Sequence, residues 1–249
     1  LGENPSFARA DQDFEHLFRS WFNRGFLVMR SVNWQSPASL LDKIIAYEAV
    51  HAINDWDDLR RRLQPDDRRC FAFFHPAMPD EPLIFVEVAL TAEIPGSIGQ
   101  VLAGERDAVS MSDVNTAVFY SISNCQAGLR GVSFGNFLIK QVAADLAESL
   151  PQLKTFVTLS PVPGLVRWCR AVRTDKALLE TLPEAVINGV SVLESIADGG
   201  PVDIAPASRE HALAATAWYF IEGKRGDRLP LDPVTRFHLG NGWGFGVLG

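Results

Sequence analysis

Hydrophobic and polar positions follow each other along the chain in two patterns, which predict a mixture of strands and helices. Short apolar runs bounded by turn residues are typical of buried strands. They lie at Cys70 to Phe74, Leu83 to Leu90, Ala117 to Ile122 and Thr155 to Leu159. Apolar residues three and four positions apart predict amphipathic helices. These cover Phe14 to Phe22, Pro37 to Ile53, Phe137 to Leu150, Leu165 to Leu182 and His211 to Ile221.

Other segments have weaker patterns. Residues 57–69 are a charge run, which predicts a solvated surface helix that ends at Pro65. A short helix is possible at Gly96 to Leu102, and the residues that follow it are typical of a mobile loop. Pro183 to Pro206 alternates short apolar stretches with Gly and Asp, which indicates helix ends and loop.

The stretch from Ala117 to Gly164 combines a strand, a glycine-rich loop, a helix, a second strand and a tight turn. Gly131, Ser133 and Gly135 stand just before the helix, where small residues let backbone N–H groups approach an anion. This arrangement suits a pyrophosphate. The loop matches neither the P-loop, which needs a Gly-Lys-Ser/Thr, nor the three-glycine dinucleotide fingerprint.

The same loop resembles the coenzyme A loop of the GNAT acyltransferase superfamily. Arg130, Gly135, Leu138 and Ile139 fill that pattern, with Ser133 in place of the first glycine. A glycine-containing turn before any amphipathic helix would look similar, so the loop alone leaves both interpretations open. The predicted substrate-binding residues are Arg130, Gly131, Val132, Ser133, Phe134, Gly135 and Asn136.

The region from Phe119 to Gly164 resembles the catalytic part of the malonyl-CoA decarboxylase family, through FYSISNCQAGLRGVSFGNFLIKQV and TLSPVPG. Further collinear segments resemble the same family at Arg24 to Ile53, Trp56 to Leu63, His75 to Leu90 and Asp232 to Gly242. The resemblance implies an α+β, GNAT-like fold with a mixed, mostly antiparallel central sheet flanked by helices. It implies a helical lead-in at residues 1–55, remnant of an N-terminal helical domain and linker, and a catalytic domain at residues 56–249.

Composition and charge narrow the class of protein. With 23 Lys and Arg against 30 Asp and Glu the net charge is -7, which disfavours nucleic acid as a partner. Three scattered cysteines match no zinc spacing, so no metal site is expected, and their odd number suggests a reducing compartment. No apolar run approaches the roughly 20 residues needed to cross a membrane. We expect no membrane partner and a cytoplasmic setting.

Ser160 is the first candidate catalytic residue. It ends a predicted strand and precedes Pro161, Pro163 and Gly164, and a serine before proline is also a common turn starter. The family resemblance implies that the serine of this segment is catalytic and binds the malonyl carboxylate or orients the thioester.

His238 is the second candidate. Phe237 and Leu239 flank it, which predicts that it emerges from an apolar strand into the turn at Gly240 to Gly242. A lone histidine in an apolar segment is more often a satisfied core residue. The resemblance implies an acid–base role, which suits an imidazole whose usual pKa is near 6.5. Asn241 is a weaker candidate for a polar contact to the substrate, and we expect Ser160 and His238 to meet in one cleft.

For two further groups of polar residues, a structural role is expected rather than a catalytic one. Glu48 and His51 stand three apart on a predicted helix, and a metal site would want more ligands, so a capping or surface pair is expected. The basic residues Arg167, Arg170, Arg173 and Lys176 form a solvated helix face, with contact to coenzyme A phosphates as the alternative.

The resemblance implies the decarboxylation of malonyl-CoA to acetyl-CoA and CO2, a step of fatty acid metabolism. The reaction passes through a thioester enolate that a histidine protonates, and it needs no cofactor beyond the coenzyme A of the substrate. Two alternatives remain: a CoA-dependent N-acyltransferase that uses the same loop, and a non-catalytic acyl-CoA-binding module. The chain looks like part of a longer protein, and we expect the full-length protein to be a homo-oligomer.

Overall fold

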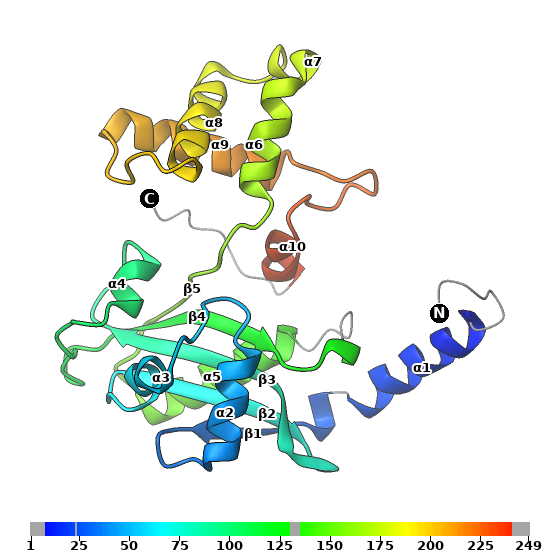
Figure 1. Ribbon diagram of the computed structural model, residues 1–249, viewed down its shortest axis with the longest axis vertical. Coiled ribbons are helices and arrows are strands. Elements are labelled where there is room, and N and C mark those ends of the chain that lie inside the picture. Colours follow the sequence, from blue (N-terminus) through cyan, green and yellow to red (C-terminus); the bar gives the residue numbers. More distant parts are fainter. Residues whose placement is uncertain (1–7, 23, 130–134, 241–249) are drawn as a thin grey trace. The chain divides into compact units, whose positions relative to one another are not determined.

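The computed structural model describes residues 8–22, 24–129 and 135–240 of the 249-residue chain. The chain divides into two compact units, Leu1–Ser160 and Pro161–Gly249. The first unit contains a sheet with helices, and the second is built from helices (Figure 1). No helix in the described part of the chain is both long and apolar enough to cross a bilayer.

The first unit is organised around a five-stranded sheet with the strand order β1-β2-β3-β4-β5. The strands are β1 (Val28–Val32), β2 (Arg68–His75), β3 (Met78–Thr91), β4 (Thr116–Asn124) and β5 (Thr155–Thr158). The first three pairings are antiparallel, and β4 pairs with β5 in parallel. The expected α+β, GNAT-like sheet, mixed and mostly antiparallel, is therefore confirmed. β1 lies within residues 1–55, between the two helices that the sequence predicts there, and the boundary at residue 55 stays a prediction.

The described residues of the first unit include both α-helices and short 3₁₀ helices. They are α1 (Ala8–Trp21), η2 (Arg24–Phe26), α2 (Ala38–Tyr47), α3 (Trp56–Leu63), α4 (Ile98–Leu102), η3 (Ala127–Leu129) and α5 (Gly135–Ser149). α3 begins where the Asp55 side chain accepts a hydrogen bond of 2.7 Å from the Asp58 N–H. The helices expected at residues 14–22, 37–53 and 137–150 are thus present with shifted ends.

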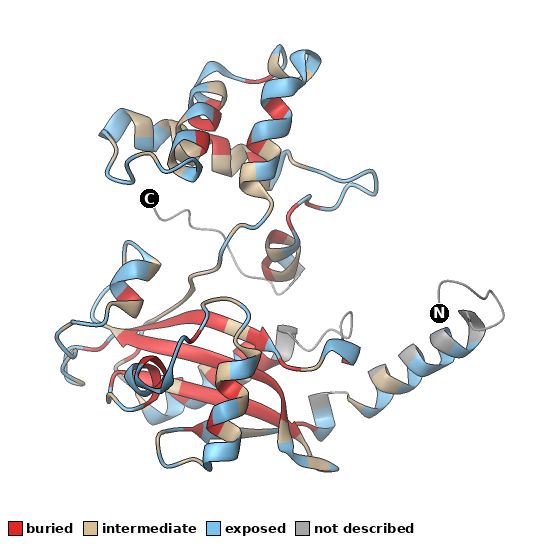
Figure 2. Ribbon diagram, in the orientation of Figure 1, coloured by how far each residue is buried: buried red, intermediate tan, exposed pale blue. Residues whose placement is uncertain are grey.

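Both faces of the sheet are buried along its central strands, and Figure 2 shows long red stretches on β2, β3 and β4. Successive side chains of a strand point to opposite faces. One face carries Ala72 and Phe74 of β2, which pack with Leu41 and Ile44 of α2 and with residues of α3. Phe71 and Phe73 point to the other face and are also buried. The apolar runs of the sequence are therefore strands covered on both sides.

A β-bulge interrupts the pairing of β3 with β4. Glu87 pairs with Ser121 and Val88 pairs with Phe119, so Tyr120 is an additional residue of β4 at this point. In such a bulge, two residues of one strand lie opposite a single residue of its neighbour. This arrangement disrupts the alternation of side chains and bends the strand. The bulge brings polar side chains of β4 close to the buried carboxyl group of Glu87.

The second unit contains α6 (Leu165–Thr174), α7 (Lys176–Leu179), α8 (Glu184–Ala197), α9 (Pro206–Ile221) and α10 (Pro233–Gly240). The expectation of helix ends and loop for residues 183–206 is wrong because α8 has 14 residues. Its sequence is rich in Val and Ile and contains Gly189, all weak helix formers. Packing supplies the missing stability: a Cβ at Gly189 would lie 1.9 Å from the His211 carbonyl oxygen of α9.

Candidate functional site

Ser160 follows β5 at the end of the first unit. The Leu159 N–H donates to the Phe119 carbonyl oxygen at 2.8 Å, which continues the parallel pairing one residue beyond the strand. Ser160 itself is half-buried. The predicted strand and the turn after it are confirmed. Ser160 lies just beyond the point where β5 leaves β4, which itself continues to Asn124.

His238 lies in α10, so the prediction of an apolar strand is wrong. Asp232 begins this helix: its Oδ1 accepts hydrogen bonds from the N–H groups of Val234 at 2.9 Å and Thr235 at 3.0 Å. Pro233 occupies the first turn, where a missing N–H costs nothing. The sequence therefore did hold a helix signal, an Asp-Pro pair, that the β-forming residues Val, Thr and Phe obscured.

The imidazole of His238 is 6% exposed and sits beside the Phe237 ring, with 5.1 Å between ring centroids. Burial lowers its pKa below the usual value, and the negative charge of Asp232 partly opposes that change. Neutral imidazole therefore predominates near pH 7 in the chain without ligand. An anion bound next to it would raise the pKa again.

Asp232 also holds the turn that follows Ser160. Its Oδ2 accepts hydrogen bonds from the Gly164 N–H at 3.4 Å and from the Tyr219 hydroxyl at 3.3 Å, and the carboxylate is fully buried. Burial, followed by the charge of Asp232, raises the pKa of Tyr219 to about 12, which keeps the hydroxyl a donor. One carboxylate thus joins the Pro-Val-Pro-Gly turn, α9 and the helix that carries His238.

The coenzyme A loop is only partly described. Arg130, Gly131, Val132, Ser133 and Phe134 lie outside the described residues, as does Asn241. Gly135 and Asn136 form the first turn of α5. The predicted pyrophosphate loop thus leads into a helix N-terminus, as its chemistry requires, and its contacts stay a prediction.

The basic face of α6 is engaged within the second unit. Arg170 pairs with Asp198 at 2.8 Å, and Arg173 pairs with Glu194 at 2.9 Å. Both partners belong to α8 or to its C-terminal end. These two arginines therefore link α6 to α8, whereas a role in phosphate binding has no support from their contacts.

A buried polar cluster lies on the α2 and α3 side of the sheet, and sequence reasoning missed it. The Glu48 carboxylate accepts hydrogen bonds from the hydroxyls of Ser121 and Ser123 at 2.7–3.0 Å, and the Ser123 hydroxyl oxygen accepts one from the Ala49 N–H at 3.1 Å. Glu48 also caps the N–H of His51. The expected capping role is correct, but the partners on β4 come from 73 and 75 residues away and leave no sequence signal.

The charge run at residues 57–69 is only partly solvated, because four of its charged residues are buried: Asp58, Arg62, Asp67 and Arg68. Arg62 pairs with Asp58 at 3.3 Å and with Glu87 at 3.4 Å. Such burial is tolerated because each charge has an opposite partner. The partner Glu87 lies on a different strand, which explains why the pattern alone predicted a solvated helix.

Three buried atoms near Arg62 have no hydrogen-bond partner within the described ranges: His51 Nε2, Glu87 Oε1 and the Tyr120 hydroxyl oxygen. Burial and the nearby Glu48 raise the pKa of Glu87 to about 8, so this carboxyl is mostly protonated at neutral pH. In the same described part of the chain, no three His, Cys, Asp or Glu side chains are grouped so that they would hold a metal ion.

Comparisons with known proteins agree on one family. Residues 25–246 match the family described as malonyl-CoA decarboxylase C-terminal domain. Two curated relatives are named mitochondrial malonyl-CoA decarboxylase: the protein of Anser anser anser is 36% identical over 96% of this chain, and that of Rattus norvegicus is 33% identical over 97%. The chain spans about half the length of these relatives, 51% and 53%.

Solved structures give the same family. Malonyl-CoA decarboxylase from Rhodopseudomonas palustris is 50% identical, with a TM-score of 0.82 over 97% of this chain and 58% of the other. The enzyme from Agrobacterium vitis is 53% identical, with a TM-score of 0.80 over 94% of this chain and 57% of the other. The extent of the family match and the agreement in fold establish that this chain belongs to the malonyl-CoA decarboxylase C-terminal domain family.

Proposed function

We propose that this chain decarboxylates malonyl-CoA to acetyl-CoA and CO2. The single observation that carries the proposal is the family match over residues 25–246, which includes both candidate catalytic residues. Relatives named for this activity align with nearly the whole chain. The proposal extends their named activity to a chain that covers about half of their length.

The proposed reaction breaks the bond between the carboxylate carbon and C2 of the malonyl group. Its electron pair moves onto the thioester, CO2 leaves, and a thioester enolate remains until C2 receives a proton. The thioester carbonyl is the electron sink, so the reaction requires neither a metal nor an organic cofactor. Hydrogen-bond donors that face the enolate oxygen stabilise the charge as it develops.

We propose that Ser160 positions the acyl group and that His238 transfers the proton. In this assignment the Ser160 hydroxyl binds the malonyl carboxylate or orients the thioester, and the protonated imidazole of His238 delivers a proton to C2 and recovers one from water. The lowered pKa of buried His238 suits the transfer of a proton to C2, because an imidazolium that forms next to an anionic substrate gives up its proton readily.

The predicted pyrophosphate site is the loop from Arg130 to Asn136. The start of α5 supports this prediction, because the first N–H groups of a helix carry partial positive charge. Asn241 is proposed as a polar contact to the substrate. Malonyl-CoA and acetyl-CoA are the proposed partners, and we propose that the full-length protein is a homo-oligomer.

We further propose that the protein acts in fatty acid metabolism in the cytoplasm. Cys70, Cys125 and Cys169 are all free and buried, which suits a reducing compartment. Burial raises the pKa of Cys125 to about 12 and that of Cys169 to about 11, so neither thiol is reactive near neutral pH.

The test is to measure CO2 and acetyl-CoA from the unmodified chain incubated with malonyl-CoA. We expect both products in equal amounts. Succinyl-CoA is the matched control: its carboxylate is one carbon farther from the thioester, so loss of CO2 would form no enolate, and no CO2 is expected. Coenzyme A binding without CO2 would contradict the proposal and indicate a binding module. Acyl transfer to an added amine without CO2 would indicate an N-acyltransferase.

A further inference from the structure

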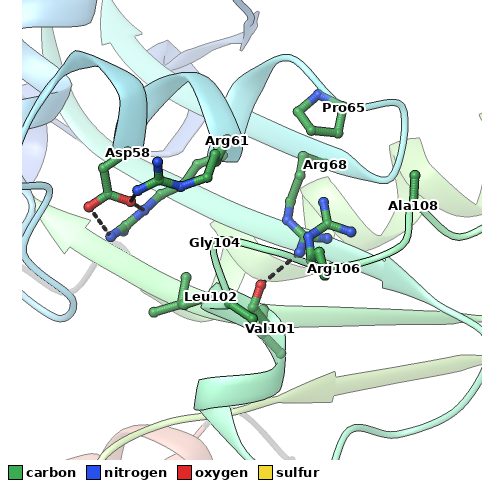
Figure 3. Close-up of a pocket in the computed structure, with 11 residues that line it drawn as sticks. Asp58, Arg61, Pro65, Arg68, Val101, Leu102, Gly104, Arg106 and Ala108 are labelled. Carbon is green, nitrogen blue, oxygen red and sulfur yellow. Dashed lines mark hydrogen bonds and ion pairs between the residues drawn. The ribbon is translucent and has the colours of Figure 1, made fainter.

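A small pocket lies in the first unit between α3, the start of β2 and the loop after α4 (Figure 3). Its volume is about 130 Å³. Ligand pockets for drug-sized molecules measure about 300–1,000 Å³, so this one suits only a small group. Four of its lining residues are arginines: Arg61, Arg62, Arg68 and Arg106.

The pocket carries more positive than negative charge. Two carboxylates lie among these four guanidinium groups: Asp58 pairs with Arg61 and Arg62, and Asp67 pairs with Arg68 and Arg106. A third carboxyl, Glu87, contacts Arg62 but has a pKa of about 8 and is mostly protonated at pH 7. Four cations therefore face about two anions at neutral pH.

Arg62 has few donors left for a ligand. Its three guanidinium nitrogens donate to Asp58, to Glu87 and to the carbonyl oxygens of His51 and Ala52. A guanidinium has five N–H groups, and these five hydrogen bonds match that number. We therefore regard Arg62 as a structural residue of the pocket wall.

The other three arginines keep N–H groups that no acceptor among the described residues uses. Arg68 donates to the carbonyl oxygens of Asp67 at 3.0 Å and Val101 at 2.7 Å. Within the described ranges, Arg106 donates only to the two carboxylate oxygens of Asp67. Arg61, whose side chain is 46% exposed, lies 3.5 Å from Asp58. Each guanidinium therefore retains N–H groups for an additional acceptor.

Two of these guanidinium groups lie close together, and Figure 3 shows Arg68 and Arg106 on the same side of the pocket. After burial, the charge of Arg106 is the largest cause that lowers the pKa of Arg68. Like charges held near each other are stabilised when an anion binds between them. A fork of parallel N–H groups also matches the oxygens of a phosphate.

We propose that this pocket binds a single phosphate group through Arg61, Arg68 and Arg106. The ligand is inorganic phosphate or the terminal phosphate of a small organic molecule, since both present the same oxygens. The proposal is independent of the decarboxylase activity, because none of these arginines is assigned to the reaction.

The test is isothermal titration of the 249-residue chain with inorganic phosphate at constant ionic strength, for the unmodified chain and three variants. We expect saturable 1:1 binding. Arg61→Gln should weaken it by about three- to fivefold, as for a half-exposed ion pair. Arg106→Lys keeps a cation beside Asp67 but loses the fork, so we expect at least about tenfold weaker binding.

Arg60→Gln is the matched control, because Arg60 is the adjacent residue of α3, its side chain is 50% exposed and it does not line the pocket. We expect its affinity to stay within about twofold of the unmodified chain. Thermal unfolding of each variant verifies that the fold is retained. No saturable binding, or equal losses in Arg60→Gln and Arg61→Gln, would overturn the proposal.

A second titration identifies the source of the phosphate. Glycerol 3-phosphate that competes with inorganic phosphate would place an organic phosphate in the pocket, and failure to compete would restrict the pocket to the free ion. Coenzyme A is compared with its 3′-dephospho form in the same way. Sulfate that binds as tightly as phosphate at pH 8, and equally well in Arg106→Lys, would contradict a site specific for phosphate.

Discussion

Asp232 is the residue on which the geometry around His238 depends. One oxygen caps α10, and the other accepts hydrogen bonds from Gly164 and Tyr219. A buried carboxylate is stable only when its oxygens are satisfied in this way. In the sequence Asp232 stands directly before Pro233, but two of its partners lie 68 and 13 residues away. Only the fold reveals that this residue links the helix that carries His238 to the turn at Gly164 and to α9.

The raised pKa of Glu87 predicts how the stability of the fold depends on pH. Its pKa in the folded chain, about 8, lies above the value near 4.3 of an unfolded glutamate, chiefly because of burial and then because of Glu48. Between these two values the folded state holds a proton that the unfolded state has released. The contribution of Glu87 to stability is therefore fully present below about pH 4.3 and is lost as the pH rises toward 8.

Glu87→Gln removes this titration, so its free energy of unfolding should depend less on pH. From pH 5 to pH 8, we expect the free energy of unfolding of the variant to rise relative to that of the unmodified chain by on the order of 3 kcal/mol. Urea unfolding at each pH measures it. Glu93→Gln, at an exposed residue shortly after the same strand, is the control for the loss of one carboxylate. A constant difference for Glu87→Gln would contradict a raised pKa.

At the scale of elements, four of the five strands and most helices were predictable, because they follow short apolar runs or apolar positions with a period of about 3.6 residues, whereas β1 was missed. The run at Leu83 to Leu90 became β3, and the run after the glycine-rich loop became α5. α8 and α10 were missed for a physical reason: tertiary packing at Gly189 and the cap from Asp232 stabilise segments of weak helix propensity. Neither contact can be read from local sequence.

The turn at Gly164 gives a prediction for packing. A Cβ at this position would lie 2.1 Å from the Tyr219 hydroxyl oxygen and 3.3 Å from Asp232 Oδ2. Gly164→Ala should therefore destabilise the second unit by about 2–3 kcal/mol, as overpacking does elsewhere. Hydrogen exchange in α9 and α10, together with denaturant unfolding, measures this loss.

Tyr219→Phe removes the atom that clashes, at the cost of one hydrogen bond to Asp232, about 1 kcal/mol. The double variant should be more stable than the sum of the two single changes predicts, by at least about 1 kcal/mol. Gly128→Ala is the control because a Cβ there has no atom within 4 Å. Strict additivity of Gly164→Ala and Tyr219→Phe would show that the hydroxyl does not set the need for glycine.

At the scale of the whole molecule, the two proposed catalytic residues belong to different compact units. Ser160 ends the first unit, and His238 lies in the last helix of the second. Residue types and family resemblance predicted both, since Ser160 precedes a Pro-x-Pro-Gly turn and His238 has a fitting pKa. That they act on one substrate stays a prediction, and it is the central claim about this molecule.

The most direct test measures CO2 release from malonyl-CoA under single-turnover conditions for Ser160→Ala and His238→Ala, with coenzyme A binding measured on the same samples. Ser191→Ala and His211→Ala are the matched controls, since both residues lie elsewhere in the second unit. We predict that CO2 release falls at least about 100-fold in each catalytic variant while coenzyme A affinity stays within about threefold. Release that remains near the unmodified rate in either variant would contradict the account.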